Sequence, residues 1–260
     1  MTHLIYSSNP IVLLIAVLLI LFLAVELSYR WGQRSKGLTA IDRDSWNTVQ
    51  AGLITLAAFM LGLTFAQAQG RWDNRRALVV TEANAIGTTW LRGDQLPAPE
   101  TAQFRQILTQ YTRERIQAYS IAGDSEVHAR VISDSDRQQT QMWALVSQAV
   151  RDHPSFGTSL LMTSLNDTID VSSEQLSALT HHVPTAVLVV TFSLVLLGAI
   201  SIGLQFARDK SRPLLLTLLY AGAFAIVLNL IVDFDRPQVG FIHVSLDPLQ
   251  IQLHSMEKSL

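Results

Sequence analysis

Four apolar stretches, each about as long as a membrane-spanning helix, constrain the fold of this chain more than any other feature. They run approximately over residues 10–27, 48–67, 183–206 and 213–232. A helix of roughly 20 apolar residues crosses the hydrocarbon core of a bilayer. Because 49% of the 260 residues are hydrophobic and 15% are charged, the chain is expected to divide between lipid and water. We predict an all-α integral membrane protein with four transmembrane helices in a lipid bilayer.

The four stretches group into two hairpins that frame a polar domain. The first hairpin takes up residues 1–70 and the second takes up residues 183–232. Between them, apolar residues recur every three or four positions, as is typical of helices, with three breaks that contain Pro or Gly. The breaks lie at residues 96–99, 123–125 and 153–155. Residues 71–182 are therefore predicted to form a helical bundle continuous with the second and third membrane helices, and residues 233–260 a C-terminal tail.

Composition and motif content exclude several classes of function. The chain has no cysteine, so disulfides, thiolate metal sites and cysteine nucleophiles are excluded. The longest basic run is Arg75-Arg76, which is too short for the electrostatic footprint of a nucleic-acid-binding protein. The seven histidines show no metal-ligand spacing, and no motif pairs a nucleophile with a base. We expect no enzyme, no cofactor, no metal site and no nucleic-acid partner.

Thr55, Phe59 and Leu63, in the second apolar stretch, follow one another at four-residue steps and so share one face of a helix. A narrow ring of such side chains can gate a pore, because an ion that enters it sheds water without replacement. The same spacing is typical of residues that pack against neighbouring helices. Spacing alone favours packing, and both interpretations stay open.

Small residues recur on two of the predicted membrane helices. On the second helix the pattern comprises Ala51, Thr55, Ala58, Gly62 and Ala66. On the third, Ala199 and Gly203 are spaced in the same way. Small residues allow helix backbones to approach closely in lipid. The contact that they predict lies either within one chain or between copies of it.

Charged residues follow two of the apolar stretches. Arg71, Arg75 and Arg76 come after the second stretch, and Asp233 and Asp235 come at the end of the fourth. Because charge inside hydrocarbon is costly, these residues are expected where the helices leave the membrane. Pairing between the two groups would join the C-terminal segment to the extension of the second helix. Unpaired arginines would instead attract anions into a confined pore mouth, and ion binding by the aspartates is the less favoured alternative.

Several sequence motifs resemble those of known families. The run FMLGLTFAQAQGRWDN, from Phe59 to Asn74, is similar to the second membrane helix of the bestrophin anion channels, where a run of the form F-x-L-G-F ends in Arg-Trp or Arg-Phe. Three further blocks resemble the bacterial bestrophin-like domain family of unknown function. They are RRALVVTEANAIGTTWLR (75–92), SLNDTID (164–170) and DFDRPQVGFIHVSLDPL (233–249).

The resemblance implies a bestrophin-like fold and an anion-permeable homo-oligomer, pentameric in bestrophins, with a pore lined by the second membrane helix. Thr55, Phe59 and Leu63 coincide with the apolar constriction of the family's pore. Small inorganic anions and other copies of the chain would then be its partners. The chain lacks a run of consecutive acidic residues after the fourth apolar stretch. This departure argues against calcium gating, because a calcium site needs about six or more oxygen ligands.

A membrane sensor or scaffold is the alternative function. In that case the two membrane hairpins would hold a helical domain that binds a ligand or a partner protein without conduction. Its weakness is that only short turns and tails remain for signalling on the other side of the membrane.

The expected location is the inner membrane of a bacterial cell, and two arguments give opposite orientations. Seven Lys or Arg residues lie in the hairpin turns near the membrane, and four lie on the opposite side. The positive-inside rule then places the turns in the cytoplasm and residues 71–182 in the periplasm. The bestrophin arrangement places the large domain and both termini in the cytosol. The charge count slightly favours the periplasmic side.

Overall fold

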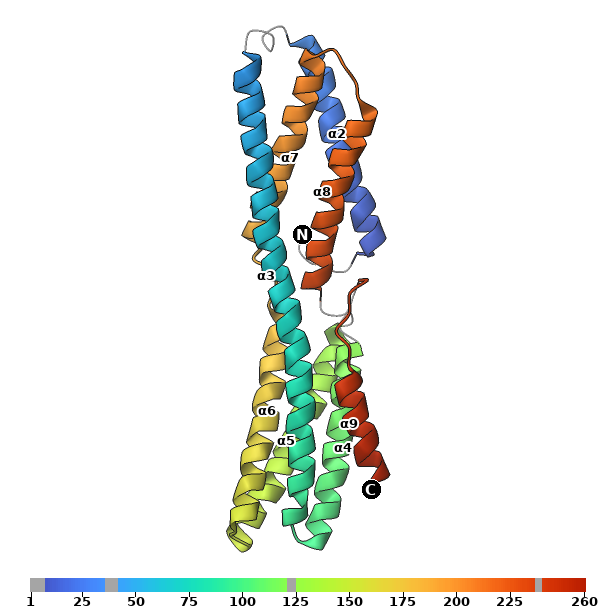
Figure 1. Cartoon of the computed structure of the whole chain (residues 1–260). Coiled ribbons are helices and arrows are strands. Elements are labelled where there is room, and N and C mark those ends of the chain that lie inside the picture. Colours follow the sequence, from blue (N-terminus) through green and yellow to red (C-terminus); the bar gives the residue numbers. More distant parts are fainter. Residues whose placement is uncertain (1–7, 36–41, 121–124, 237–239) are drawn as a thin grey trace. The chain divides into compact units, whose positions relative to one another are not determined.

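A computed structural model describes residues 8–35, 42–120, 125–236 and 240–260, and within them every regular element is a helix (Figure 1). The helices are α2 (Pro10–Arg34), α3 (Arg43–Arg92), α4 (Ala98–Ser120), α5 (Ser125–Asp152), α6 (Phe156–Thr180), α7 (Thr185–Arg208), α8 (Leu214–Asp235) and α9 (Asp247–Lys258), with a short 3₁₀ helix, η2 (Gly93–Gln95). The all-α class predicted from the sequence is confirmed.

The helices belong to two compact units. Unit 1 comprises Met1–Arg71 and His182–Ile242, and unit 2 comprises Trp72–His181 and His243–Leu260. Helix α3 is continuous from the first unit into the second and passes through Gly70 without a break. The sequence predicted such an extension of the second membrane helix beyond its apolar stretch, and α3 reaches Arg92.

Unit 1 contains α2, α7, α8 and the first part of α3. Four helical segments of the described chain, each including one of these helices, are long and apolar enough to cross a membrane. Helix α2 packs along both α7 and α8. Leu21, Ala57 and Val195 are fully buried in the shared core. The hydroxyl groups of Thr64 on α3 and Thr191 on α7 form a buried hydrogen bond of 3.0 Å.

The crossing of α2 and α7 depends on one glycine. A Cβ atom at Gly203 would overlap the Ser28 hydroxyl and the carbonyl oxygen of Val25, both on α2. The Ser28 hydroxyl already donates to the carbonyl oxygen of Ala24 at 2.7 Å, so its position is fixed by its own helix. Because neither the backbone nor this bonded hydroxyl can move away, only glycine permits this approach.

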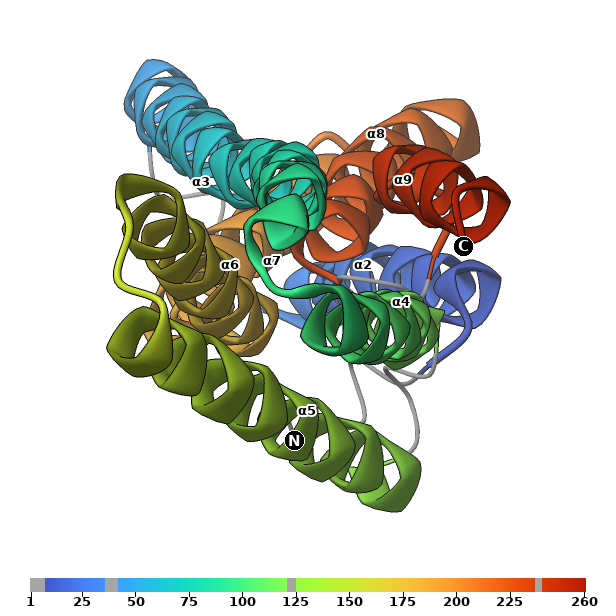
Figure 2. The same cartoon turned by 90° about the horizontal axis from the view of Figure 1, so that it is seen from below.

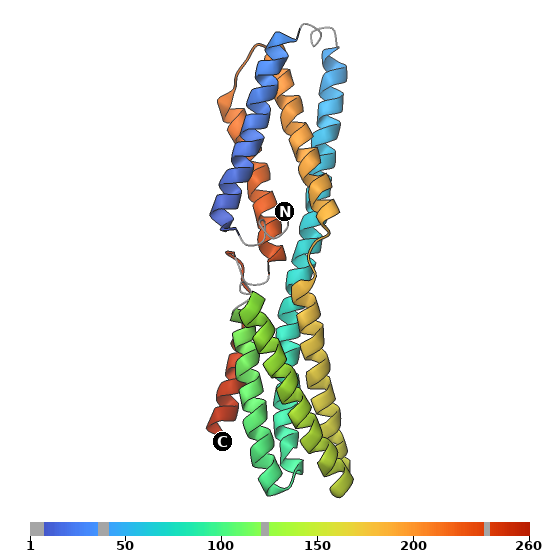
Figure 3. The same ribbon diagram turned by 180° about the vertical axis from the view of Figure 1, so that it is seen from behind.

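Unit 2 is a bundle of α4, α5, α6, α9 and the second part of α3. Helix α5 packs against both α4 and α6, and α9 packs against α4 (Figures 2 and 3). The core contains Ile86, Phe104, Met142 and Leu165, each with 0% exposure. Two of the three predicted breaks match described helix ends, since η2 precedes the break at 96–99 and α5 ends at Asp152. The remaining break falls mainly on residues 121–124, which lie outside the described residues.

The C-terminal residues are shared between the units. Residues up to Ile242 belong to unit 1, whereas the segment from His243 onwards belongs to unit 2. There, Leu249 and Met256 of α9 are fully buried in the bundle core. From the sequence we predicted residues 233–260 as one C-terminal tail, because a single short helix with two core residues gives only a weak periodic signal.

Candidate functional site

Within unit 1, helix α3 has one buried face and one exposed face. The buried positions, none more than 8% exposed, are Gln50, Ala57, Leu61, Thr64 and Ala68. Thr55, Phe59 and Leu63 lie on the opposite face, where the Phe59 residue is 61% exposed and the Leu63 residue 46% exposed. Packing within the described part of the chain therefore leaves all three side chains largely uncovered.

The exposed face of α3 differs in composition from the exposed faces of α2 and α8. On α2 and α8 most exposed positions in the apolar stretches carry large aliphatic side chains, such as Leu19, Leu23 and Leu219. On α3 the exposed positions are mainly small or polar. They include Ala51, Gly52, Thr55, Ala58, Gly62, Ala66, Gln67, Gln69 and Gly70. Polar groups facing hydrocarbon are costly and small residues mark close helix contacts, so this face is unlike a lipid-facing surface.

The exposed face of α3 continues past Gly70. On this face the next exposed positions are Asp73 and Asn74, three and four residues after Gly70, followed by Ala77 and Asn84 at steps of seven residues. Apart from large apolar residues such as Phe59 and Leu63, the exposed face of α3 is therefore mainly small or polar, and it includes the acidic side chain of Asp73.

An apolar groove lies between α3 and α8 in unit 1. Its volume is about 480 Å³, and it is lined by Ala58, Gly62 and Phe65 from α3 and by Phe224 and Val227, among others, from α8. The small residues on α3 leave this space open. The described side chains of unit 1 do not fill it.

Arg75 has a structural task that the sequence did not reveal. Its residue is 1% exposed, and its Nε and Nη2 atoms donate to the carbonyl oxygens of Ala178 and His181 at 3.0 and 2.9 Å. These carbonyls stand at the C-terminal end of α6, where a helix lacks internal partners and favours a positive charge. Arg75 thereby stabilises the end of α6 from the buried face of α3.

The two other arginines of the predicted cluster are placed differently. Arg76 is exposed, and its guanidinium carbon lies 5.9 Å from the centre of the Trp72 ring, within reach of a cation–π contact. Arg71 is half-buried, and its Nε atom has no hydrogen-bond partner among the described residues. The three arginines thus do not share one environment.

Asp233 and Asp235 bind backbone amides. Both oxygens of Asp235 accept from the Val183 N–H at 3.0 Å, so this carboxylate fixes the start of the segment that enters α7. Asp233 accepts from the N–H groups of Phe241 and Ile242 at 2.9 to 3.1 Å. Pairing of these aspartates with the arginines of α3 stays a prediction. Among the described residues, no three His, Asp or Glu side chains are grouped to hold a metal ion.

The turn after α8 is shaped around Asp233. Gly240 has a φ of +146°, and a Cβ atom there would collide with the Asp233 carboxylate. Arg236 is 1% exposed and donates to the Ser8 carbonyl oxygen at 2.7 Å. The sequence signal for these tasks was the dense Asp-Phe-Asp-Arg run that directly follows the fourth apolar stretch.

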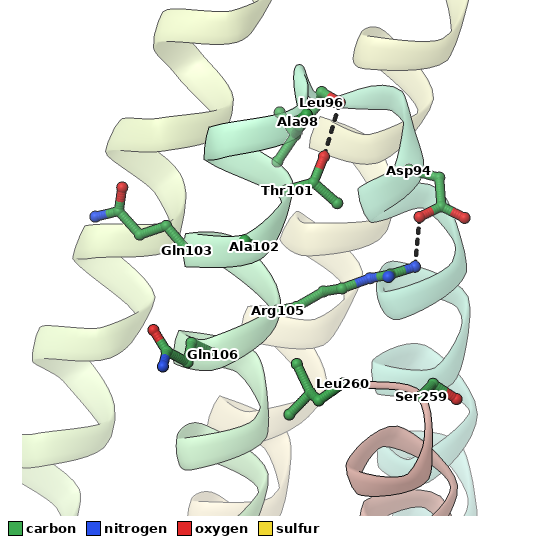
Figure 4. Close-up of a pocket in the computed structure, with 10 residues that line it drawn as sticks. All are labelled: Asp94, Leu96, Ala98, Thr101, Ala102, Gln103, Arg105, Gln106, Ser259 and Leu260. Carbon is green, nitrogen blue, oxygen red and sulfur yellow. Dashed lines mark hydrogen bonds and ion pairs between the residues drawn. The ribbon is translucent and has the colours of Figure 1, made fainter.

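A hollow with a volume of about 870 Å³ lies in unit 2 (Figure 4). Figure 4 shows Arg105 pointing toward Asp94, with which it forms an ion pair. The Arg105 guanidinium also lies 4.9 Å from the centre of the Trp90 ring, and the Thr101 hydroxyl donates to the Leu96 carbonyl oxygen at 2.7 Å. The charges of Arg105 and Asp94 in its wall thus offset one another.

The fold is that of an all-helical membrane protein in which a spanning helix continues into a helical bundle. A model of the bestrophin-like domain matches residues 16–249, so the chain belongs to the bestrophin-like family, whose fold is found in known channels. Comparison with curated protein sequences finds no significant match.

Solved structures share this fold at low sequence identity. A variant of a bacterial bestrophin homologue from Klebsiella pneumoniae gives a TM-score of 0.69 at 15% identity, over 97% of this chain and 97% of that one. A second variant gives 0.64 at 17% identity, over 96% and 97% of the two chains. The homologue solved by zinc phasing gives 0.63 at 15% identity, over 95% and 96%. These likenesses confirm the bestrophin-like fold predicted from the sequence.

Proposed function

We propose that several copies of this chain form an ion channel whose pore is lined by the exposed face of α3. The observation that carries the proposal is the composition of that face, which is mainly small or polar apart from Phe59 and Leu63, within a helix apolar enough to cross a membrane. In a single chain this face would place Gln67 and Gln69 against lipid, at an energetic cost. In an oligomer around a common axis it would face water.

The constriction of this pore would consist of Thr55, Phe59 and Leu63. They share one face and are exposed in the single chain, so copies of α3 around an axis could bring them into rings. Apolar rings of this kind oppose the passage of hydrated ions until they widen. The open groove between α3 and α8 supports self-association, because a neighbouring copy can fill it. The bestrophin resemblance makes a pentamer the expected oligomer.

Two kinds of permeating ion have support. The bestrophin resemblance favours small inorganic anions. One observation favours cations: Asp73 lies on the exposed face of α3, whereas Arg75 is buried on the opposite face and binds backbone carbonyls. An acidic ring would concentrate cations at its level of the pore. We retain anion permeation as the first candidate and cation permeation as the second.

Flux into liposomes tests conduction. Replacing both Phe59 and Leu63 by Ala should widen and hydrate the constriction, and so raise chloride or potassium flux above the wild-type rate. Leu23→Ala is the matched control, because Leu23 is 50% exposed on α2 and lies outside the proposed pore. The sensor or scaffold function would be favoured instead by either of two results. One is a purified protein that is monomeric; the other is ion flux no greater than that of empty liposomes for both the wild type and the double variant.

The reversal potential in a planar bilayer under a KCl gradient distinguishes the two ions. Asp73→Asn should move the reversal potential toward the chloride equilibrium potential. Asp167→Asn, at an exposed position of α6, should leave it unchanged. A reversal potential unaffected by Asp73→Asn would remove the argument for cations.

Reporter fusions at Lys36 and at the C-terminus decide the orientation. The charge count predicts a Lys36 fusion active as a cytoplasmic reporter and a C-terminal fusion active as a periplasmic reporter. Lys36 itself lies outside the described residues. The opposite pair of results would support the bestrophin arrangement.

A further inference from the structure

The core of unit 2 contains a layer of polar side chains from three helices. The Gln139 side chain on α5 donates to the Tyr111 hydroxyl on α4 at 3.3 Å and to the Ser172 hydroxyl on α6 at 3.1 Å. Tyr111 is fully buried, and Ser172 is 7% exposed. These two bonds fix the register of α4, α5 and α6 at this level.

The next layer follows from helix geometry. Helix α5 runs antiparallel to α4 and α6 (Figure 3). One turn further along the bundle, residue numbers therefore rise by three or four on α4 and α6 and fall by four on α5. The step leads from Tyr111 to Arg115, from Gln139 to Ser135, and from Ser172 to Gln175. Each of these is four or three residues away on the same helix face. Arg115, Ser135 and Gln175 therefore occupy one layer, which we call the Gln175 layer.

Much of the Gln175 layer lacks hydrogen-bond partners. Gln175 is fully buried, Ser135 is 3% exposed and Arg115 is 5% exposed. Among the described residues, both amide atoms of Gln175, the Ser135 hydroxyl and Nη2 of Arg115 have no partner. Leaving a buried amide or hydroxyl unbonded costs roughly 1–3 kcal/mol, and native proteins rarely do so. Such groups from three helices in one layer indicate a shared guest that bonds to them.

The charge of Arg115 is balanced on one side only. Its Nε donates to Glu82 at 2.6 Å, and the Tyr119 hydroxyl donates to the other oxygen of Glu82 at 2.9 Å, so this carboxylate is satisfied. Burial is the largest single effect and would lower the pKa of Arg115, but the charge and hydrogen bond of Glu82, together with Tyr111 and Tyr119, outweigh it and raise the pKa, so the guanidinium stays protonated. The Glu82 carboxylate bonds to Nε of Arg115, whereas Nη2 of the same guanidinium is unbonded and can donate to a guest.

We propose that the Gln175 layer is a buried binding site for a small inorganic anion of halide size. Three of the unbonded groups can donate, namely Arg115 Nη2, Gln175 Nε2 and the Ser135 hydroxyl, whereas Gln175 Oε1 is the one unbonded group of these three residues that can only accept. A water molecule beside the anion donates to that oxygen. The near-complete burial of all three residues shields the site from bulk water and favours a small guest.

This site is separate from the proposed pore. Glu82 projects from the buried face of α3, opposite the exposed positions such as Asn84. The anion would therefore join α3, α4, α5 and α6 inside unit 2 without entering the conduction path. Its tests need no ion flux and stand whether or not the chain conducts.

Anomalous diffraction from crystals of the full chain soaked in sodium bromide tests occupancy directly. We expect a bromide peak within hydrogen-bond distance of Arg115 Nη2, Gln175 Nε2 and Ser135 Oγ. Ordered water alone at these atoms, without a bromide peak, would overturn the proposal.

Thermal unfolding provides the second test. The melting temperature of the wild type should be higher in bromide than in gluconate at equal ionic strength. The difference should be roughly 3–6 °C at ten times the dissociation constant. Gln175→Leu keeps the side-chain size, fits the surrounding core and should abolish the difference, while Ser135→Ala should reduce it. Gln117→Leu, at an exposed position of α4, is the control and should keep it. An equal bromide effect in Gln175→Leu would contradict the assignment.

Discussion

The two small-residue patterns in unit 1 have the same sequence form and opposite surroundings. On α7, Ala199 is fully buried, and Gly203 touches the backbone of α2 so closely that no side chain fits. On α3, every member of the pattern is exposed, and a Cβ atom at Gly62 would meet nothing within 4 Å. One pattern is used for packing inside the chain, and the other is left without a partner in the described chain.

The difference shows what such a pattern can and cannot predict. Small residues indicate that a helix makes a close contact, but they do not identify the other helix. Since α2 satisfies the pattern on α7, the pattern on α3 remains for a contact outside the single chain. Together with the groove beside α8, this favours another copy of the protein as the partner of α3.

The largest expected effect comes from placing a large side chain in the small-residue pattern of α7, which already packs against α2. Gly203→Leu should prevent α2 from packing on α7, because the new side chain would overlap the backbone at Val25. Forced overpacking costs about 1–3 kcal/mol and more where backbone is involved, so the melting temperature should fall by roughly 10 °C or the protein should not accumulate. Fluorescence-detected size exclusion and thermal unfolding in detergent measure both outcomes.

Gly62→Leu is the matched change in the unused pattern. It should leave the fold of the chain intact, because the position is open, and should instead lower the fraction of oligomer and the ion flux. Size exclusion with light scattering measures the oligomer. If Gly62→Leu unfolds the chain as Gly203→Leu does, the contrast between the two patterns is wrong.

The next effect concerns the two faces of α3 after residue 70. Arg75→Ala removes hydrogen bonds to the last turn of α6 and should destabilise the protein by about 2–3 kcal/mol, since bonds to charged groups are worth about 1.5–3 kcal/mol. Arg76→Ala, at the neighbouring exposed position, should change stability by about 0.5 kcal/mol or less. Chemical denaturation would compare the two. Equal losses would show that the buried position of Arg75 has no special role.

These residues also show where sequence reasoning ended. Periodicity and composition predicted the four apolar helices, the continuous α3 and the helical bundle, because these depend on neighbours within one or two turns. The task of Arg75 depends on the carbonyls of Ala178 and His181, about a hundred positions away, and no local pattern encodes that contact. The spacing of Phe59 and Leu63 fixed their shared face, but only the packed chain reveals that this face is exposed.

The smallest expected effect sharpens the comparison within α3 itself. Thr64→Val keeps the shape of the side chain but removes the buried hydroxyl pair with Thr191, which should cost about 1 kcal/mol, as polar contacts between membrane helices do. Thr55→Val makes the same change on the exposed face. It should leave stability unchanged and lower ion flux, because it makes the proposed constriction less polar. Thermal unfolding and liposome flux are measured for both variants. A loss of stability in Thr55→Val, and none in Thr64→Val, would show that Thr55 rather than Thr64 packs within the chain.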